Sequence, residues 1–238
     1  MASGCLALIW LYCFIKGVSL LFSVVFFATG IIEKLKIAVF EAASEATFPQ
    51  FYSIFEPSMS EKSTKKLKLW ELDRLDEAQF KAQPKFPIVL VLDSIRSLNN
   101  IGAFFRTADA FNIEQIILCG ITAQPPHREI HKTALGATET VQWSYEADLM
   151  TALENQRKKG YQIGVVEQAV KTTLLQDVHV LEAKGFALVF GNEVDGVDQS
   201  ALDVADHIIE IPQFGTKHSL NVSVCAGIVM WEFVKRYI

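Results

Sequence analysis

A single arginine on an otherwise apolar segment is the first residue whose surroundings suggest chemistry. Arg106 lies within residues 99–111, where apolar side chains recur at helical spacing. A guanidinium on so apolar a helix requires an anionic partner, which is either a ligand or an internal carboxylate such as Asp109. Gly102 lies one turn earlier on the same face and has no side chain, so a substrate backbone could approach Arg106 along that side.

A polar turn, Gly191-Asn-Glu-Val-Asp-Gly196, directly follows the apolar run at residues 186–190. Glycine at both ends permits a ligand to approach the backbone closely. The carboxylate of Glu193 is suited to orient a hydroxyl or the guanidinium of Arg106, and the alternative is a plain β-turn. The turn lacks Gly-Lys-Ser/Thr, and the chain lacks Gly-x-Gly-x-x-Gly. The sequence therefore indicates neither a nucleoside-triphosphate loop nor a dinucleotide fold.

A third polar stretch separates an apolar run from the last helix. Pro212 and Gly215 are incompatible with regular structure there. Ser219 and Asn221 are natural capping residues, and we expect Ser219 to cap the helix that follows.

That last helix has no charged residue from Val224 to Trp231, so both its faces must be covered. One face suits the protein's own sheet and contains Val222, Ala226, Val229 and Phe233. The opposite face contains Val224, Ile228 and Trp231. A second copy of the chain is the simplest cover for the opposite face, so the sequence predicts a homodimer through the C-terminal helix.

Alternating strands and helices are expected to position these residues. Continuous apolar runs of strand length indicate a parallel sheet buried on both faces, at residues 88–92, 115–118, 161–166, 186–190 and 207–211. Helices are expected at residues 99–111, at residues 147–159 after a loop containing Pro125 and Pro126, and after Ser219. The pattern predicts an α/β fold, a parallel sheet covered by helices on both faces. Ligands usually bind at the carboxyl edge of such a sheet, where the polar stretches follow the strands.

Three segments also resemble, in the expected order, the motifs of the SpoU (TrmH) family, the RNA ribose 2′-O-methyltransferases of the knotted SPOUT class. The resemblance covers about residues 88–238, and three ordered motifs are a far more specific signal than one. In order, the first, second and third motifs are Asn100-Ile-Gly-Ala-Phe-Phe-Arg106, Phe190-Gly-Asn-Glu-Val-Asp-Gly196 and Ile211-Pro-Gln-Phe-Gly-Thr-Lys-His-Ser-Leu-Asn-Val-Ser-Val224.

The resemblance implies a C-terminal trefoil knot (the SPOUT or α/β knot) that binds S-adenosyl-L-methionine, largely through main-chain groups. Carried over to this chain, Gly191, Ile211 and Leu220 line the cofactor cleft, and Glu167 borders it. No periodicity argument leads to a knot, because knots are nearly absent from protein folds.

The implied reaction is methyl transfer to a ribose 2′-hydroxyl, which requires alignment of two reactants and loss of a proton from a weakly acidic alcohol. Arginine is a poor base because its pKa exceeds about 12. We therefore expect Arg106 to bind the adjacent phosphate and stabilise the developing oxyanion. The family's arginine is also proposed to activate the hydroxyl itself, and the sequence leaves both roles open. Asn100, Glu193, Ser219 and Asn221 would position Arg106 and the ribose.

Transfer RNA is the expected substrate, because the sequence shows no separate RNA-binding domain ahead of the catalytic segment. Ribosomal RNA is the first alternative. The second is a non-catalytic RNA-binding or assembly protein that retains the fold, and the intact Arg106, Glu193 and Asn221 argue against it.

The composition limits how the chain can contact RNA. Half of the residues are hydrophobic, which excludes a disordered chain, and the formal net charge is −5. RNA contacts must therefore come from a local patch. The densest basic cluster lies in the expected N-terminal arm, residues 59–87, and contains Lys62, Lys65, Lys66 and Lys68. Leu69, Leu72 and Leu75 follow it as a helical stripe. The arm is either a solvated lead-in helix or a phosphate-contacting element.

The cysteines and histidines do not indicate a metal site. Cys5, Cys13, Cys119 and Cys225 show no Cys-x-x-Cys spacing and are typical of reduced thiols in a cytosolic protein. His127 and His131 are four residues apart but lack a second ligand pair, so we interpret them as ordinary polar histidines.

Residues 1–58 differ in composition from the rest of the chain. The run at residues 5–32 is apolar, but Lys16 divides it into stretches shorter than the roughly 20 residues of a spanning helix. A basic segment, as in a secretory signal, does not precede it. We interpret residues 1–58 as an apolar extension upstream of a start at Met59, with a genuine membrane anchor as the alternative. On the first interpretation the protein is cytoplasmic.

Overall fold

The computed structural model describes residues 64–178 and 184–238. The chain divides into two compact units, Met1–Glu71 and Leu72–Ile238, and the second contains the sheet. The expectations for residues 1–58 lie outside the described residues. In the part of the chain that the structure describes, no helix is long and apolar enough to cross a membrane.

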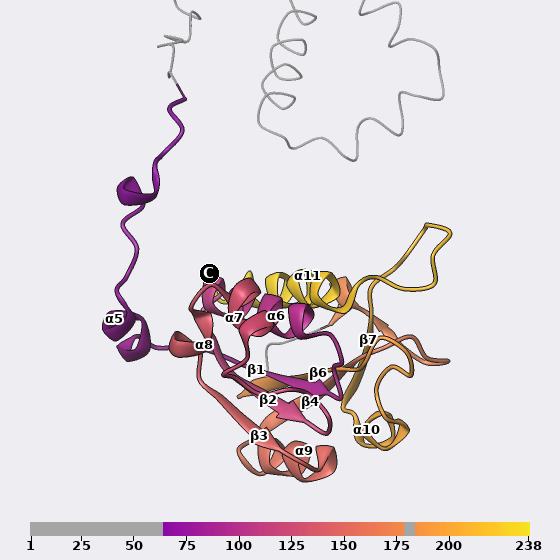
Figure 1. Ribbon diagram of the computed structural model, residues 1–238. Helices are drawn as coiled ribbons and strands as arrows, with labels where there is room; N and C mark the ends of the chain where they lie inside the picture. The colour runs from indigo at the N-terminus through magenta and orange to yellow at the C-terminus, as the bar shows by residue number, and fades with distance from the viewer. Residues whose placement is uncertain (1–63, 179–183) are drawn as a thin grey trace, which may run out of the picture. The chain divides into compact units, whose positions relative to one another are not determined.

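The second unit is built on a seven-stranded parallel sheet with the strand order β3-β2-β1-β6-β4-β7-β5 (Figure 1). In chain order the strands are β1 (Phe86–Asp93), β2 (Ile113–Cys119), β3 (Trp143–Glu146), β4 (Tyr161–Val166), β5 (Thr173–Leu174), β6 (Gly185–Phe190) and β7 (His207–Glu210). The five predicted strands are confirmed as β1, β2, β4, β6 and β7. The two edge strands, β3 and β5, were not predicted because they are short and only partly buried.

Helices cover both faces of the sheet (Figure 1). α6 (Leu98–Ala110), α7 (Arg128–Ala134) and α11 (Val222–Val234) lie on one face, and α9 (Leu149–Lys158) and α10 (Gln199–Val204) lie on the other. Successive residues of β1 point to opposite faces. Leu90 therefore belongs to the core beneath α6 and α11, whereas Val89 and Val91 belong to the core against α9. Because both cores are apolar, the strand reads as a continuous apolar run, and the predicted doubly covered α/β fold is confirmed.

The segment after β2 differs from the expected loop. It contains α7 and the short helix α8 (Ala137–Thr140), and α7 packs closely against α6. A β-carbon at Gly102 would collide with Thr133 Oγ1 and the carbonyl oxygen of Ile130. The expectation that a substrate backbone approaches Arg106 past Gly102 is therefore wrong, because α7 occupies that space.

The residues ahead of the sheet do not form one helix. A single 3-10 turn, Leu69–Glu71, ends the first unit, and α5 (Glu77–Ala82) begins separately in the second. Asp76 starts α5 with a capping box, in which its side chain accepts from the amide of Gln79 and the Gln79 side chain accepts from the amide of Asp76. The predicted continuous helical stripe is wrong, since leucines at threefold spacing are not sufficient to bridge this break.

Candidate active site

The motif loops meet at the carboxyl edge of the sheet, where β1, β6, β4 and β7 are consecutive strands. Parallel strands all end at the same edge, so the segments that follow them become neighbours. The buried carboxylate of Asp93, the last residue of β1, accepts a hydrogen bond of 3.0 Å from the amide of Asp198 beyond the second motif. The loop between β7 and α11 extends away from the sheet (Figure 1).

A hydrogen-bond network joins one residue from each motif. Asn100 Nδ2 donates to Glu193 Oε1 over 2.7 Å, and Asn221 Nδ2 donates to Asn100 Oδ1 over 3.2 Å. Asn100 lies in the first turn of α6, Glu193 in the turn after β6, and Asn221 directly before α11. The structure therefore brings together three of the predicted site residues, and both ends of the Asn100 amide are used.

Asn221 is the N-cap of α11. Its Oδ1 accepts from the backbone amides of Ser223 (3.0 Å) and Val224 (3.3 Å) and from the hydroxyl of Ser223. Because Oδ1 is occupied by the helix terminus, Nδ2 is directed toward Asn100. The prediction that Ser219 caps this helix is wrong, since the helix begins only at Val222.

Glu193 is held as a carboxylate. Its burial opposes ionisation, but hydrogen bonds from the Asn100 side chain and from backbone amides, including that of Arg96 (3.4 Å), outweigh burial and lower its pKa. A carboxylate with a lowered pKa is a weak base at neutral pH. Glu193 is therefore suited to orient neighbouring groups, and the expectation that it orients Arg106 is wrong, because it contacts Asn100 and Arg96.

Arg96 and Ser97 belong to this site although sequence reasoning missed them. Arg96 forms an ion pair with Asp195 over 3.2 Å, which fastens the loop after β1 to the second-motif turn. Ser97 is the N-cap of α6 and accepts from the amide of Asn100 over 3.3 Å. A serine three residues before Asn100 was an available N-cap signal. No sequence pattern predicts the contact between Arg96 and Asp195, because it depends on the pairing of β1 with β6.

Arg106 stands apart from the network on the exposed side of α6. It forms no hydrogen bond or ion pair with any described residue. Asp109, which the sequence offered as an internal partner for Arg106, instead accepts a hydrogen bond from the hydroxyl of Thr140. A solvated guanidinium without an internal partner is available to an external anion.

The predicted cofactor residues occupy two adjoining loops. Gly191 is buried, and a β-carbon there would collide with the backbone of Gly196 and Val197, so its missing side chain accommodates the protein's own turn. Ile211 is partly buried directly after β7, and Leu220 is 38% exposed before α11. We expected a ligand to approach the backbone beside Gly191, but Gly196 and Val197 of the same turn occupy that space.

Glu167 and Gln168, directly after β4, connect these two loops. Glu167 Oε2 accepts from the amide of Val197 over 3.1 Å, and Gln168 Nε2 donates to the carbonyl oxygen of His218 over 3.0 Å. Glu167 therefore lies against the second-motif turn, and its place at the border of the cofactor cleft stays a prediction. Its carboxylate is engaged by the protein's own amides.

The residues of the third-motif loop fit a ligand that binds main-chain groups. Among the described residues, the contact from Gln168 is the one hydrogen bond formed by residues 213–220. Ser219 is exposed and without a hydrogen bond to any described residue. Backbone donors and acceptors of this loop thus have no partner among the described residues, and Gln168 and Glu167 connect the loop with the second-motif turn, which suits the cofactor implied for this class of fold.

The described histidines and cysteines do not assemble a metal site. His127 is the N-cap of α7, where its Nδ1 accepts from the amide of Glu129 over 3.2 Å. Within the described ranges, no group of three His, Cys, Asp or Glu side chains is arranged to hold a metal ion.

Comparison with known proteins first defines the class. The structure of an S-adenosylmethionine-bound rRNA methyltransferase from Sinorhizobium meliloti matches with a TM-score of 0.61 and 26% identity, covering 65% of this chain and 58% of that one. The model of the SpoU rRNA Methylase family matches residues 87–231. The chain belongs to this family.

Two sequence relatives come from bacteria. The 23S rRNA (guanosine-2′-O-)-methyltransferase RlmB of Vibrio parahaemolyticus is 32% identical over 167 residues, which cover 70% of this chain and 66% of the relative. A tRNA/rRNA methyltransferase of Synechocystis, itself uncharacterized, is 36% identical over 174 residues, covering 70% of this chain and 42% of the relative. The chain therefore spans less than two thirds of the length of these relatives.

Proposed function

We propose that this chain is an S-adenosyl-L-methionine-dependent methyltransferase that modifies the ribose 2′-hydroxyl of RNA. The observation that carries the proposal is the network of Asn100, Glu193 and Asn221, which unites the three motifs at the carboxyl edge of the sheet. Family membership supports the same reaction. A non-catalytic role is disfavoured, because a protein that only bound RNA would not need an ionised Glu193 hydrogen-bonded to Asn100 of the first motif.

Ribosomal RNA and transfer RNA are both candidate substrates. The sequence favoured transfer RNA, but relatives named as 23S rRNA methyltransferases support ribosomal RNA at least as well. We propose ribosomal RNA as the first substrate to test and transfer RNA as the second.

The protein's part in the reaction follows from the arrangement of its side chains. The cofactor, when bound, supplies the methyl group. Arg106 is free to bind the phosphate next to the target ribose, and its charge stabilises the oxygen as the hydroxyl proton passes to solvent. Glu193 remains ionised and holds Asn100, while Asn221 holds the other end of the Asn100 amide. This pre-ordering lets the site act without rearrangement during the transfer.

The cofactor cleft is proposed to lie between the second-motif turn and the third-motif loop, which would form the knot of this class. Supporting observations are the buried turn at Gly191 and the unpaired main-chain groups between Ile211 and Leu220. Ser219 is proposed to contact the ribose, since its hydroxyl has no partner within the described residues.

A homodimer through α11 is the proposed assembly. The predicted inner face of this helix is buried at Ala226, Val229 and Phe233. The opposite face is exposed as expected, with Val224 at 54%, Ile228 at 41% and Trp231 at 49%. Large apolar side chains at adjacent helix turns form a patch that a two-fold contact would cover.

We propose a cytoplasmic location. The two cysteines of the described residues, Cys119 and Cys225, are free thiols. Burial raises the pKa of Cys119 to about 12 and that of Cys225 to about 11, so both stay protonated and unreactive. Fractionation of cells that express the full chain should place it with soluble proteins, and recovery with membranes would contradict this proposal.

Methyl transfer to defined RNA fractions tests the activity. Purified protein is incubated with methyl-labelled S-adenosyl-L-methionine and either ribosomal or transfer RNA from cells that lack this gene. We expect label in one fraction, within an alkali-resistant dinucleotide that reports 2′-O-methylation. Label on a base, or a folded protein that shows no binding of the cofactor by calorimetry, would refute the proposal.

A further inference from the structure

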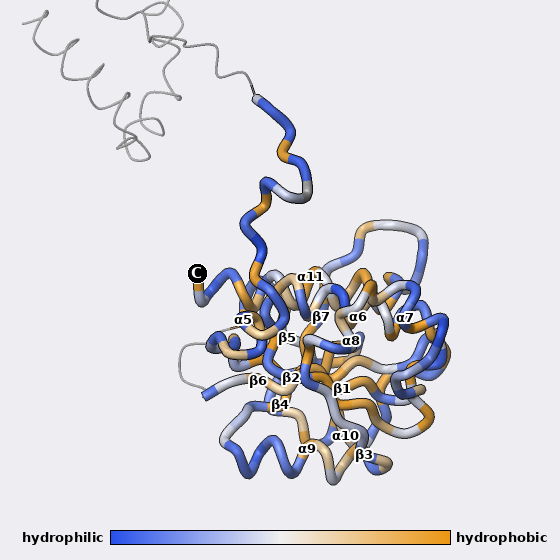
Figure 2. Tube along the Cα trace, turned by 60° about the vertical axis from the view of Figure 1, so that its left-hand side comes forward, coloured by the Kyte–Doolittle hydropathy of each residue, from blue (hydrophilic) through white to orange (hydrophobic). Residues whose placement is uncertain are grey.

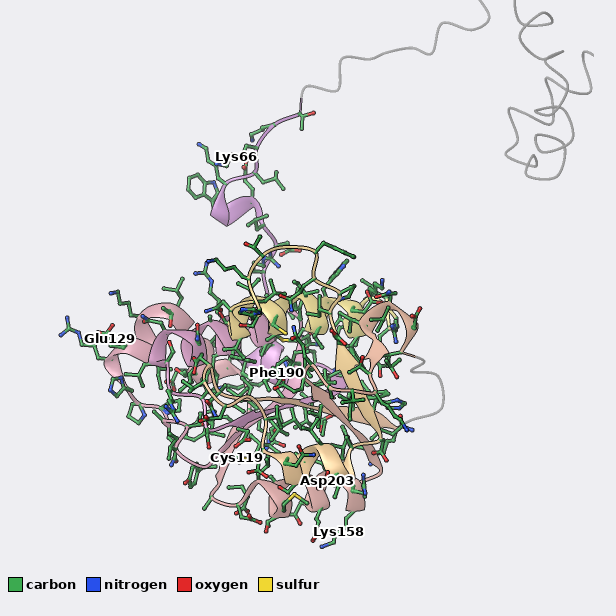
Figure 3. The ribbon with its side chains drawn as sticks, turned by 90° about the vertical axis from the view of Figure 1, so that its right-hand side faces the viewer. Lys66, Cys119, Glu129, Lys158, Phe190 and Asp203 are labelled. Atoms are coloured by element: carbon green, nitrogen blue, oxygen red, sulfur yellow. The ribbon has the colours of Figure 1, made fainter. Side chains whose placement is uncertain are left out.

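The short segment Thr64–Glu71 carries a second set of groups that suit nucleic acid. It belongs to the first unit and lies ahead of the region matched by the family model. Its sequence, Thr-Lys-Lys-Leu-Lys-Leu-Trp-Glu, combines three lysines with one tryptophan. Figure 3 labels Lys66 on this segment.

Glu71 gives the segment a fixed local shape. Its carboxylate accepts from Lys65 Nζ over 2.6 Å and from the amide of Lys68 over 2.8 Å. The amide of Glu71 in turn donates to the carbonyl oxygen of Lys68 over 2.9 Å. These contacts hold Lys65 and the 3-10 turn on one carboxylate, and the same hydrogen bonds lower the pKa of Glu71.

The remaining groups of the segment are presented outward. Trp70 is 79% exposed, and Lys68 Nζ lies 5.0 Å from the centre of its ring. Lys66 is exposed and forms no ion pair with any described residue. At this exposure most of the Trp70 side chain is left uncovered by the described residues, and the cation beside it favours a ligand that is both aromatic and anionic.

We propose that residues 65–70 bind single-stranded RNA, with Trp70 stacked on a base and Lys66 and Lys68 against the flanking phosphates. Stacking on an aromatic side chain tolerates any base, and lysines bind phosphate without reading sequence. The segment thus adds affinity for an unpaired stretch of the RNA. This inference rests on the proposed function for its biological meaning, although the binding itself can be measured without methyl transfer.

A membrane surface is the competing partner for lysine and tryptophan. Binding in the membrane interface requires an amphipathic helix with a broad apolar face. The helical part of this segment is a single turn, Leu69–Glu71, and Glu71 places a carboxylate on it. A stacked base needs only one aromatic ring, so the segment fits RNA better.

The test uses the full chain and a fluorescein-labelled oligouridylate of 12 nucleotides. Wild-type protein should bind it more tightly than an RNA duplex of equal length, and Trp70→Ala should raise the dissociation constant about 5- to 150-fold. Trp70→Phe should retain most of the affinity, whereas Trp70→Leu should behave like Trp70→Ala. A double variant, Lys66→Ala with Lys68→Ala, should reduce the slope of log K against log salt by about 1.4.

Matched measurements separate this inference from the proposed function. Lys158→Ala, which removes an exposed lysine from α9, should leave binding of the oligonucleotide unchanged. All variants should keep wild-type affinity for S-adenosyl-L-methionine. If Trp70→Ala binds the oligonucleotide like wild type, the inference is wrong even where methyl transfer persists. If Trp70→Ala lost binding to vesicles that contain anionic phospholipid but kept its binding to RNA, the segment would be assigned to membranes instead.

Discussion

The helices α9 and α11, on opposite faces of the sheet, have outer surfaces of opposite character. α9 exposes Glu154, Arg157 and Lys158, while its buried side packs on β2 and β4. α11 also buries one side, but its exposed side is apolar. Figure 2 shows hydrophilic residues along α9, and Figure 3 places Lys158 and Asp203 on the outside of that layer. One apolar side is enough to attach a helix to a sheet, so the second apolar side of α11 indicates a further contact.

The N-cap residues of α9 and α11 also differ in how far their hydrogen bonds reach. Asp148 caps α9 through the amide of Thr151 over 2.8 Å, and the hydrogen bonds of its carboxylate to described residues stay within that turn. Asn221 caps α11 and also reaches Asn100 in the first motif. A common local device thus serves only stability on one layer and joins the proposed site on the other. Catalysis and assembly are therefore both expected on the layer of α6 and α11.

The largest difference between the layers should appear on removal of Arg106 from α6. Arg106→Ala should lower methyl transfer by about 10²- to 10³-fold, because the charge that stabilises the developing oxyanion is lost. Affinity for S-adenosyl-L-methionine and the melting temperature should not change, since Arg106 has no partner among the described residues. Lys158→Ala on α9 is the control and should be fully active. Near-normal turnover of Arg106→Lys would show that a single charge suffices and that no bidentate clamp exists.

The second-largest effect is expected on the proposed dimer. Ile228→Asp places a charge in the exposed apolar side of α11 and should weaken the dimer by about 30-fold or more, as for loss of a central interface residue. Sedimentation velocity over a range of concentrations measures this change. Lys158→Asp, which places the same charge on α9, should leave sedimentation unchanged. A wild-type chain that sediments as a monomer would contradict the proposed homodimer through α11.

Replacement of the two N-caps should separate stability from activity. Asn221→Ala and Asp148→Ala should each cost about 1 kcal/mol of unfolding free energy, because each leaves helix amides without an acceptor. Only Asn221→Ala should also lower methyl transfer, since it releases Asn100. Denaturant unfolding and single-turnover rates provide the two measurements. Equal loss of activity in both variants would show that the layers do not differ in this respect.

The smallest expected effect is the pH dependence of Glu193. Its pKa is lowered from the ordinary value of 4.5, so the hydrogen bonds of its carboxylate stabilise the folded state above that value. Their contribution should be lost as the pH falls through the lower pKa of the folded state. The stability difference between wild type and Glu193→Gln should therefore be constant from pH 6 to 8, as read from chemical denaturation, and should shrink below about pH 4.5. A difference that grew as the pH fell would contradict the lowered pKa.

The fold followed from the sequence because burial on both faces leaves a strong local signal. The apolar runs at β1, β4 and β6 are continuous, and their ends fell within two residues of the prediction. β3 and β5 carry no such signal, since edge strands are short and half-covered. The helices α7 and α8 were missed for a different reason: they are short, and α7 is held by its contact with Gly102 of α6, which no local pattern encodes.

For the site, the sequence determined which residue types are present and that they follow strands. Tertiary structure alone decided which of them touch. Asn100 and Asn221 are 121 residues apart, and they meet because parallel pairing aligns the ends of β1 and β7 at one edge. The same geometry gives the cap of α11 to Asn221 rather than Ser219 and leaves Arg106 without an internal partner. Local propensity cannot distinguish these outcomes, because the energies of capping and pairing depend on neighbours that only the folded sheet supplies.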